Sequence, residues 1–211
     1  MKSILVLETQ KYPEDFLAIL SARTPYSPIK LVVVGDDDLP KTKLLLMYSR
    51  GEIPISYVPT VFENFSHRID FEDNFLIVSL WDTSGQEQYD RLRPLSYSNA
   101  DIILILFDIN RRKTFDNVNS KWGDEIRHYC DDVECILVGI HGEGENCLSD
   151  ESDKQCVTEE EGKECAQRFG ARKYVQIHLN EKESINKLFE DAAIYGLLYN
   201  YKYKKHLKTD D

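Results

Sequence analysis

The residues best suited to chemistry stand in one short stretch, residues 29–45, which reads IKLVVVGDDDLPKTKLL. A run of apolar, mostly β-branched residues ends at Gly35, and Lys41 and Thr42 follow. This order is typical of a phosphate-binding loop, in which backbone N–H groups and a lysine bind phosphate oxygens and a hydroxyl binds Mg²⁺. Between Gly35 and Lys41, however, the chain has three aspartates and a proline where such loops are rich in glycine.

These replacements disfavour phosphate binding. Pro40 has no N–H group and a fixed φ, so one donor is missing and the close approach of the backbone is obstructed. Asp37 and Asp38 would repel a polyphosphate, by about 3 kcal/mol for each charge pair at roughly 5–6 Å and an effective dielectric constant near 20. The loop therefore predicts weak phosphate binding.

The same residues have a structural interpretation, which we favour. An aspartate at a helix N-cap followed by proline in the first turn is an ordinary helix start that suits the helix dipole. In that case Lys41 would pair with Asp37 or Asp38, a carboxylate standing in place of a phosphate.

The elements that must position this loop alternate between apolar strands and amphipathic helices. A hairpin near Asp73–Asn74 adds one strand before the second of these runs. The predicted strands are 29–35, 75–82, 101–108, 134–140 and 173–179, and the predicted helices are 41–49, 114–130, 158–170 and 184–203. This alternation predicts a doubly wound, mostly parallel sheet with helices on both faces. Ligands of such sheets bind beyond the carboxyl ends of the strands, where Gly35, Asp82 and Asp108 fall.

Three divisions of the chain are predicted: an amino-terminal extension (1–28), a single α/β domain (29–203) and a carboxy-terminal tail (204–211). Within the extension, Phe16, Ile19 and Leu20 would share one side of a short helix. This helix would either cover the phosphate-loop site or form an independent surface helix.

The composition indicates a soluble globular protein, with 42% hydrophobic and 30% charged residues. A net charge of −11 argues against nucleic acid or an anionic membrane as the main partner. The five cysteines contain no CxxC pair and are expected to be reduced thiols, with a disulfide or a metal site as the alternative. Because no apolar run approaches about 18 residues and no signal peptide is evident, we expect a cytoplasmic protein.

Three further stretches carry a family resemblance: YVPTVFENF (57–65), WDTSGQEQYDRLRPLSY (81–97) and KWGDEIRHYC (121–130). They resemble the two switch regions and the third helix of Rho-family small GTPases. The resemblance extends from Ile29 to about Tyr199. It implies a Ras-like domain of the P-loop GTPase type, with a six-stranded, mostly parallel sheet.

The guanine-recognition motifs of that family are altered here. The N/T-K-x-D motif is replaced by Ile140, His141, Gly142 and Glu143, and the serine-alanine motif after the last strand by His178-Leu179. Ile53 stands where the first switch usually offers an aromatic ring. Since a site built to pair a polar edge loses discrimination when its partner is misplaced, guanine-nucleotide binding is expected to be weak or lost.

The hydrolytic residues of the family are retained. By resemblance, Gln86 would orient the attacking water, Thr42, Thr60 and Asp82 would hold or support Mg²⁺, and Gly85 would sense the γ-phosphate. Alternatively, Thr60 and Asp82 serve local hydrogen bonding and Gln86 has no role. The degenerate nucleotide-binding set is Gly35, Asp37, Asp38, Pro40, Lys41, Thr42, Thr60, Asp82, Gly85 and Glu143.

The partner-facing residues are better preserved, and exposed aromatic and apolar residues beside arginine make good interface anchors. Trp81 could be either buried or displayed. By resemblance, the surface that meets effectors and regulators comprises Tyr57, Val61, Phe62, Trp81, Tyr89, Arg91, Leu92 and Leu95. The chain ends KHLKTDD without a prenylation motif, so no stable lipid anchor is expected.

Three hypotheses follow. The first is a monomeric pseudo-GTPase that needs no cofactor and binds effector or regulator proteins. The second is a slow GTPase that binds GTP or GDP with Mg²⁺ and uses Lys41, Thr42, Asp82 and Gln86. A third, weaker one is binding of another phosphate compound through Lys41 and the helix terminus.

Overall fold

The structure, a computed structural model, describes residues 12–13, 15–22, 27–52, 62–141 and 156–204. Six strands form one sheet in the order β2-β3-β1-β4-β5-β6, and only the β2–β3 pair is antiparallel. The strands are β1 (Ile29–Val34), β2 (Phe62–Phe71), β3 (Asn74–Thr83), β4 (Ile102–Asp108), β5 (Glu134–His141) and β6 (Lys173–His178). The predicted Ras-like sheet is confirmed.

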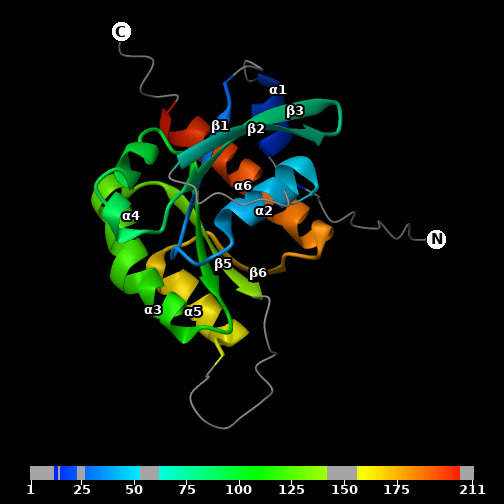
Figure 1. Cartoon of the computed structure of the whole chain (residues 1–211). Coiled ribbons are helices and arrows are strands. Elements are labelled where there is room, and N and C mark those ends of the chain that lie inside the picture. The colour runs from blue at the N-terminus through cyan, green and yellow to red at the C-terminus, as the bar shows by residue number, and fades with distance from the viewer. Residues whose placement is uncertain (1–11, 14, 23–26, 53–61, 142–155, 205–211) are drawn as a thin grey trace, which may run out of the picture.

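Helices cover both faces of the sheet (Figure 1). The helices are α1 (Phe16–Ala22), α2 (Lys41–Arg50), α3 (Arg112–Asn117), α4 (Asp124–Cys130), α5 (Glu159–Phe169) and α6 (Lys182–Tyr199). One hydrophobic cluster joins the sheet to α1, α2 and α6, and a second joins its other face to α3, α4 and α5. A π-helical turn, Val118–Gly123, connects α3 to α4, so the helix predicted at 114–130 is one helical run with a wider turn in its middle.

The strands are buried because both faces of the sheet are covered. Along β1, Leu31 and Val33 belong to the first cluster, whereas Val32 and Val34 belong to the second. This is the two-residue period of a strand. All four side chains have no exposed surface, and burying each contributes about 1.5–3 kcal/mol. The central strands therefore form a rigid base for the loops at their carboxyl ends.

The ends of α5 lie at residues that typically cap helices. Thr158 and Glu161 form a capping box at the start of α5, and Gly170, at φ +81°, ends it. The predicted end of this helix at Gly170 is confirmed.

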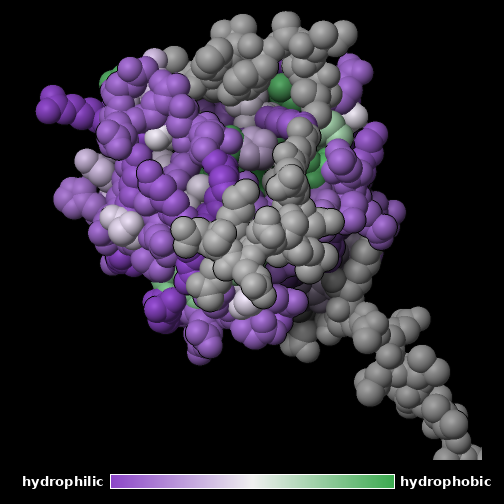
Figure 2. All heavy atoms as spheres, turned by 60° about the horizontal axis from the view of Figure 1, so that its bottom comes forward, coloured by the Kyte–Doolittle hydropathy of each residue, from purple (hydrophilic) through white to green (hydrophobic). Residues whose placement is uncertain are grey.

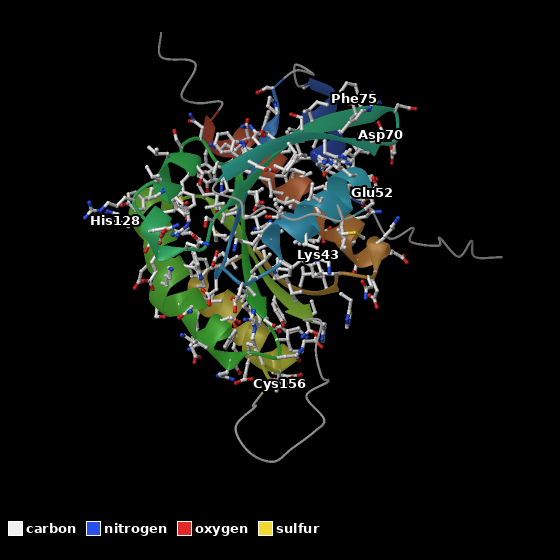
Figure 3. The ribbon with its side chains drawn as sticks, viewed as in Figure 1. Lys43, Glu52, Asp70, Phe75, His128 and Cys156 are labelled. Carbon is white, nitrogen blue, oxygen red and sulfur yellow. The ribbon has the colours of Figure 1, made fainter. Side chains whose placement is uncertain are left out.

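The amino-terminal helix α1 lies at the opposite end of the molecule from the phosphate-like loop. Because β1 and β3 are parallel, with Ile29 beside Val78 and Val33 beside Asp82, the β2–β3 turn marks the amino end of β1. In Figure 3, Asp70 and Phe75 lie at this turn and Cys156 lies at the far end. The described part of the extension therefore does not cover the loop. The predicted short helix is present on the surface of the domain, and it packs against the core through Phe16, which has no exposed surface.

Candidate functional site

The loop after β1 begins at a glycine that its surroundings require. Gly35 has φ +148°, and a Cβ there would lie 2.8 Å from the carbonyl oxygen of Leu106. Beyond it, the N–H of Leu39 donates to the carbonyl of Asp36 (3.1 Å), and the N–H of Lys41 donates to the carbonyl of Leu39 (2.8 Å). Since Pro40 has no N–H, three successive positions present no free backbone donor to a phosphate.

Helix α2 starts differently from the prediction. Its N-cap is Pro40, at φ −79° and ψ 50°, and no side chain caps the helix. The predicted aspartate cap is therefore wrong. The carboxylate of Asp38 is bound elsewhere, by the guanidinium of Arg111, which also donates to Asp108 at the end of β4 (2.8 Å). This bridge ties the loop to the neighbouring strand.

Lys41 is turned back into the loop. Its side chain is 4% exposed, and its ammonium group donates to the carbonyl oxygen of Asp36 at 2.5 Å. Within the described part of the chain it forms no ion pair with Asp37 or Asp38, so the predicted pairing is wrong. Burial lowers the pKa of Lys41 to about 8, although the charges of Asp82, Asp37 and Asp36 oppose this shift.

Thr42 and Asp82 are brought together, as a magnesium site would need. Both are buried, and the Thr42 hydroxyl donates to the Asp82 carboxylate. The predicted third member, Thr60, lies outside the described residues. Thr42 and Asp82 would suit Mg²⁺, but the loop suits the phosphates that such an ion accompanies poorly, because Pro40 has no N–H group and those of Leu39 and Lys41 are bound within the loop.

The segment after β3 lies against the loop. A Cβ at Gly85 would fall 2.4 Å from both the amide nitrogen of Asp37 and the carbonyl oxygen of Gly35. Only glycine permits this contact. The loop backbone therefore packs directly against Gly85, the residue that the family resemblance assigns to sensing the γ-phosphate.

Arg93 fixes the same segment from within, and sequence reasoning missed it. Its side chain is 1% exposed and donates to two backbone carbonyls, those of Ser84 (2.8 Å) and Gln86 (3.2 Å). It also forms ion pairs with Asp90 and Glu125, both at 2.6 Å. These contacts of Arg93 hold the second switch from within the protein. In the sequence, Arg93 stands among exposed residues, and this position gave no sign that its side chain is buried.

The helical run around the π-turn holds the loop as well. Asp36 accepts hydrogen bonds from Asn117 and Trp122, both at 2.8 Å. Lys121 donates to the carbonyl of Gly85 (3.4 Å). Loop, switch and helix are therefore connected into one unit. An extra-wide helical turn of this kind is frequent at functional sites and has no simple sequence signature.

The two altered recognition motifs meet at the ends of β5 and β6. His141 and His178 are register partners, and their rings stack at 3.9 Å with an angle of 4° between the planes. Burial, and then the neighbouring charge of His178, lower the pKa of His141. Glu143 lies outside the described residues. A stacked pair of imidazoles stands where the family resemblance places residues that read guanine.

The predicted partner surface contains a cavity. It measures about 300 Å³ and includes Trp81, Tyr89, Leu92 and Leu95 among its lining residues. Leu92 and Leu95 are 55% and 73% exposed, whereas Trp81 is half-buried beneath the Lys30 ammonium, 3.4 Å from the ring centre. Tyr57, Val61 and the side chain of Phe62 lie outside the described residues.

The end of the molecule that carries the loop is polar. Figure 2 turns this end toward the viewer, and the described residues there are mostly hydrophilic. No group of three or more metal-ligating side chains is found among the residues described. In the same part of the chain, no helix is long and apolar enough to cross a membrane.

The cysteines depart in part from the expectation. Cys130, Cys135 and Cys165 are free, as predicted. Cys156 is disulfide-bonded, so the expectation of five reduced thiols is wrong, and its partner lies outside the described residues.

Comparisons with known proteins agree with the fold. The family model described as "Ras family" matches residues 30–195. The chain is 46% identical to the Ras-like GTP-binding protein RHO1 of Entamoeba histolytica over 165 residues, covering 78% of this chain and 74% of that protein. It is 42% identical to the GTP-binding protein rho5 of Schizosaccharomyces pombe (80% and 87% covered) and 39% identical to the GTP-binding protein RHO1 of Candida albicans (85% and 93% covered).

Proposed function

Because the chain belongs to the Rho family of small GTPases, we propose that it is a pseudo-GTPase: a signalling protein that binds effector or regulator proteins through its switch surface, with GTP binding and hydrolysis weak or lost. Rho-type signalling is the role of the family as a whole. The family role does not imply loss of the nucleotide cycle, and this loss is what we propose for this chain.

The observation that carries the proposal is the self-bound loop. In a working phosphate loop, the backbone N–H groups and the lysine must be available to the nucleotide. Here Leu39 and Lys41 donate their N–H groups within the loop, Pro40 has none, and the Lys41 ammonium is bound to Asp36. A nucleotide would have to break the two backbone hydrogen bonds to use those donors, and it would also have to approach the carboxylates of Asp37 and Asp38.

A second observation explains how a switch surface could persist without nucleotide. In nucleotide-dependent switches, contacts to the γ-phosphate and Mg²⁺ order the segment. Here Arg93, bound to Asp90, Glu125 and two backbone carbonyls, supplies charge-assisted contacts to this segment from the protein. The exposed Leu92 and Leu95 are thereby presented on a fixed segment.

The alternative, a slow GTPase, is favoured by two retained features. Thr42 and Asp82 lie in hydrogen-bond contact next to Lys41, as a magnesium–nucleotide site would require. Gln86 is also retained, but its side-chain oxygen accepts a hydrogen bond from Gln88 (2.8 Å).

Nucleotide content separates the two. The full chain would be purified with Mg²⁺ present and denatured, and the supernatant would be analysed by ion-exchange chromatography beside a conventional Rho GTPase handled identically. We expect no guanine nucleotide from this chain and an equimolar amount from the control. Stoichiometric GDP or GTP from this chain would establish the slow GTPase instead.

A further inference from the structure

The amino-terminal helix α1 is fastened to one end of the β2–β3 hairpin. Phe16 packs edge-on against Phe71 at the end of β2, with ring centres 4.9 Å apart, and Tyr12 completes the group at 5.3 Å from Phe16 and 5.7 Å from Phe71. Leu20 is 5% exposed and belongs to the same core cluster. Three aromatic rings thus bind a segment outside the predicted domain to the tip of the hairpin.

A polar contact and an unusual backbone mark the tip itself. Asn74, the first residue of β3, donates to the Ser21 hydroxyl of α1 at 3.4 Å. Between the two strands, Glu72 has φ +51°, a left-handed conformation that residues other than glycine rarely adopt. The turn is therefore held in a form that is costly on its own and that its surroundings must support.

The other end of the hairpin leads into both switches. In the β2–β3 ladder, Phe71 pairs with Asn74 at the tip, and Phe62 pairs with Thr83 nine residues away. Phe62 lies in the stretch that resembles the first switch (57–65), and Thr83 lies in the stretch that resembles the second (81–97). A change of register or twist at the tip is therefore transmitted along a continuous ladder to both switch segments.

The helix is also suited to detach. A seven-residue helix is too short to be stable in isolation, so α1 depends on its packing. It makes its contacts with the hairpin tip and α6, through a small number of side chains. Segments of this kind are among the first to open locally while the rest of a domain stays folded.

We propose that α1 is a regulatory clamp on the β2–β3 hairpin. When docked, it fixes the hairpin tip against α6 and so sets the position of both switch segments. When released, it loosens the hairpin as far as Phe62 and Thr83 and changes the surface presented to partners. The regulatory consequence depends on the proposed function of the switch surface, but the clamp itself does not.

Hydrogen–deuterium exchange of the full chain, read by mass spectrometry, tests the clamp without nucleotide or partner. The variant is Phe16→Ala with Leu20→Ala. We expect exchange to become about tenfold faster in peptides spanning 62–66 and 79–83, with no change in β4. Because global unfolding would expose every strand, unchanged exchange in β4 shows that the opening is local.

The matched control is Phe115→Ala, which removes a buried ring from the cluster on the other face of the sheet. This substitution should not selectively accelerate hydrogen–deuterium exchange in the β2–β3 hairpin. Should the double variant fold poorly, Tyr12→Ala removes only the half-buried ring and should give the same pattern with smaller amplitude. The clamp is refuted if hydrogen exchange in the hairpin of the double variant is as slow as in the unmodified chain. It is also refuted if exchange becomes faster in all strands together. Neither result would affect the pseudo-GTPase proposal, which the nucleotide assay tests separately.

Discussion

The ammonium group of Lys41 donates a 2.5 Å hydrogen bond to the backbone carbonyl of Asp36, within the loop that it follows. In a phosphate-binding loop this lysine neutralises the nucleotide. Here it closes the loop on itself, while Arg111 holds the carboxylate of Asp38 from outside. The loop has become a structural link between β1 and α2. Substitutions in it should therefore have measurable effects on stability and on nucleotide binding.

The buried Lys41 gives the protein a distinctive pH dependence. Its pKa is lowered to about 8 from an ordinary value of 10.5 by burial. Below pH 8 the lysine is charged in both states and the burial cost is present in full. Between pH 8 and 10.5 the unfolded chain holds the proton and the folded chain has lost it, so stability rises with pH in this window.

Comparison with Lys41→Met isolates this effect from other titrating groups. From about pH 7.5 to about pH 10, we expect the unmodified chain to gain about 2–3 kcal/mol of unfolding free energy relative to the variant. Urea denaturation at a series of pH values measures it. A difference that stays flat, or that falls with rising pH, would show that Lys41 is not buried as a charged group.

The loop itself can be tested by reversing its departures from the family. Asp37→Gly, Asp38→Ala and Pro40→Gly together remove the two carboxylates and restore two glycines. We expect Mg²⁺–GDP to raise the melting temperature of this variant, but not of the unmodified chain. Because His141 and His178 remain, ADP should act almost as well as GDP. If the triple variant binds neither nucleotide, the loop is not the limiting obstacle.

Arg93 should be essential to the fixed second switch. Arg93→Ala removes the ion-pair partner of Glu125 and the side-chain donor to the Ser84 carbonyl, at a cost of about 3–5 kcal/mol in unfolding free energy. Glu125 then keeps only the Tyr97 hydroxyl as a side-chain donor. Arg91→Ala is the matched control, since Arg91 lies in the same segment but is exposed, and should change stability by less than about 0.5 kcal/mol. Equal effects of the two substitutions in chemical denaturation would contradict the assigned role of Arg93.

A substitution on the exposed partner surface should weaken partner binding without changing the stability of the fold. Leu95 is 73% exposed, so Leu95→Asp should alter unfolding free energy by less than about 0.5 kcal/mol. Affinity for the cognate domain, identified from a panel of purified Rho-type effector and exchange-factor domains, should fall at least about tenfold. Tyr129→Asp, on the exposed part of α4, should leave it unchanged. Equal loss with both variants would place the binding surface elsewhere.

Much of the fold could be read from the sequence, because apolar period and helix-end chemistry are local signals. The strands and the end of α5 at Gly170 follow directly from them. The start of α2 could not be read in this way. Asp38 and Pro40 fit an ordinary helix start, but Arg111, seventy-three residues away in the chain, binds the carboxylate instead. A tertiary ion pair overrode a local preference.

The site shows the same division between local and tertiary information. Residue types identified the loop, Asp82 and the exposed leucines. They did not reveal the burial of Arg93 or the π-turn that brings Asn117, Lys121 and Trp122 to the loop and the switch, since these depend on packing between segments. The place of α1 was also hidden, because an amphipathic helix pattern does not say which surface it meets.

Calorimetric titration of nucleotide-free protein with GTP in the presence of Mg²⁺ tests the central claim most directly. A self-bound loop predicts no saturable heat up to millimolar nucleotide, with a conventional Rho GTPase titrated in parallel as the positive control. Saturable one-to-one binding with a micromolar or tighter dissociation constant, lost on Lys41→Met substitution, would contradict the account.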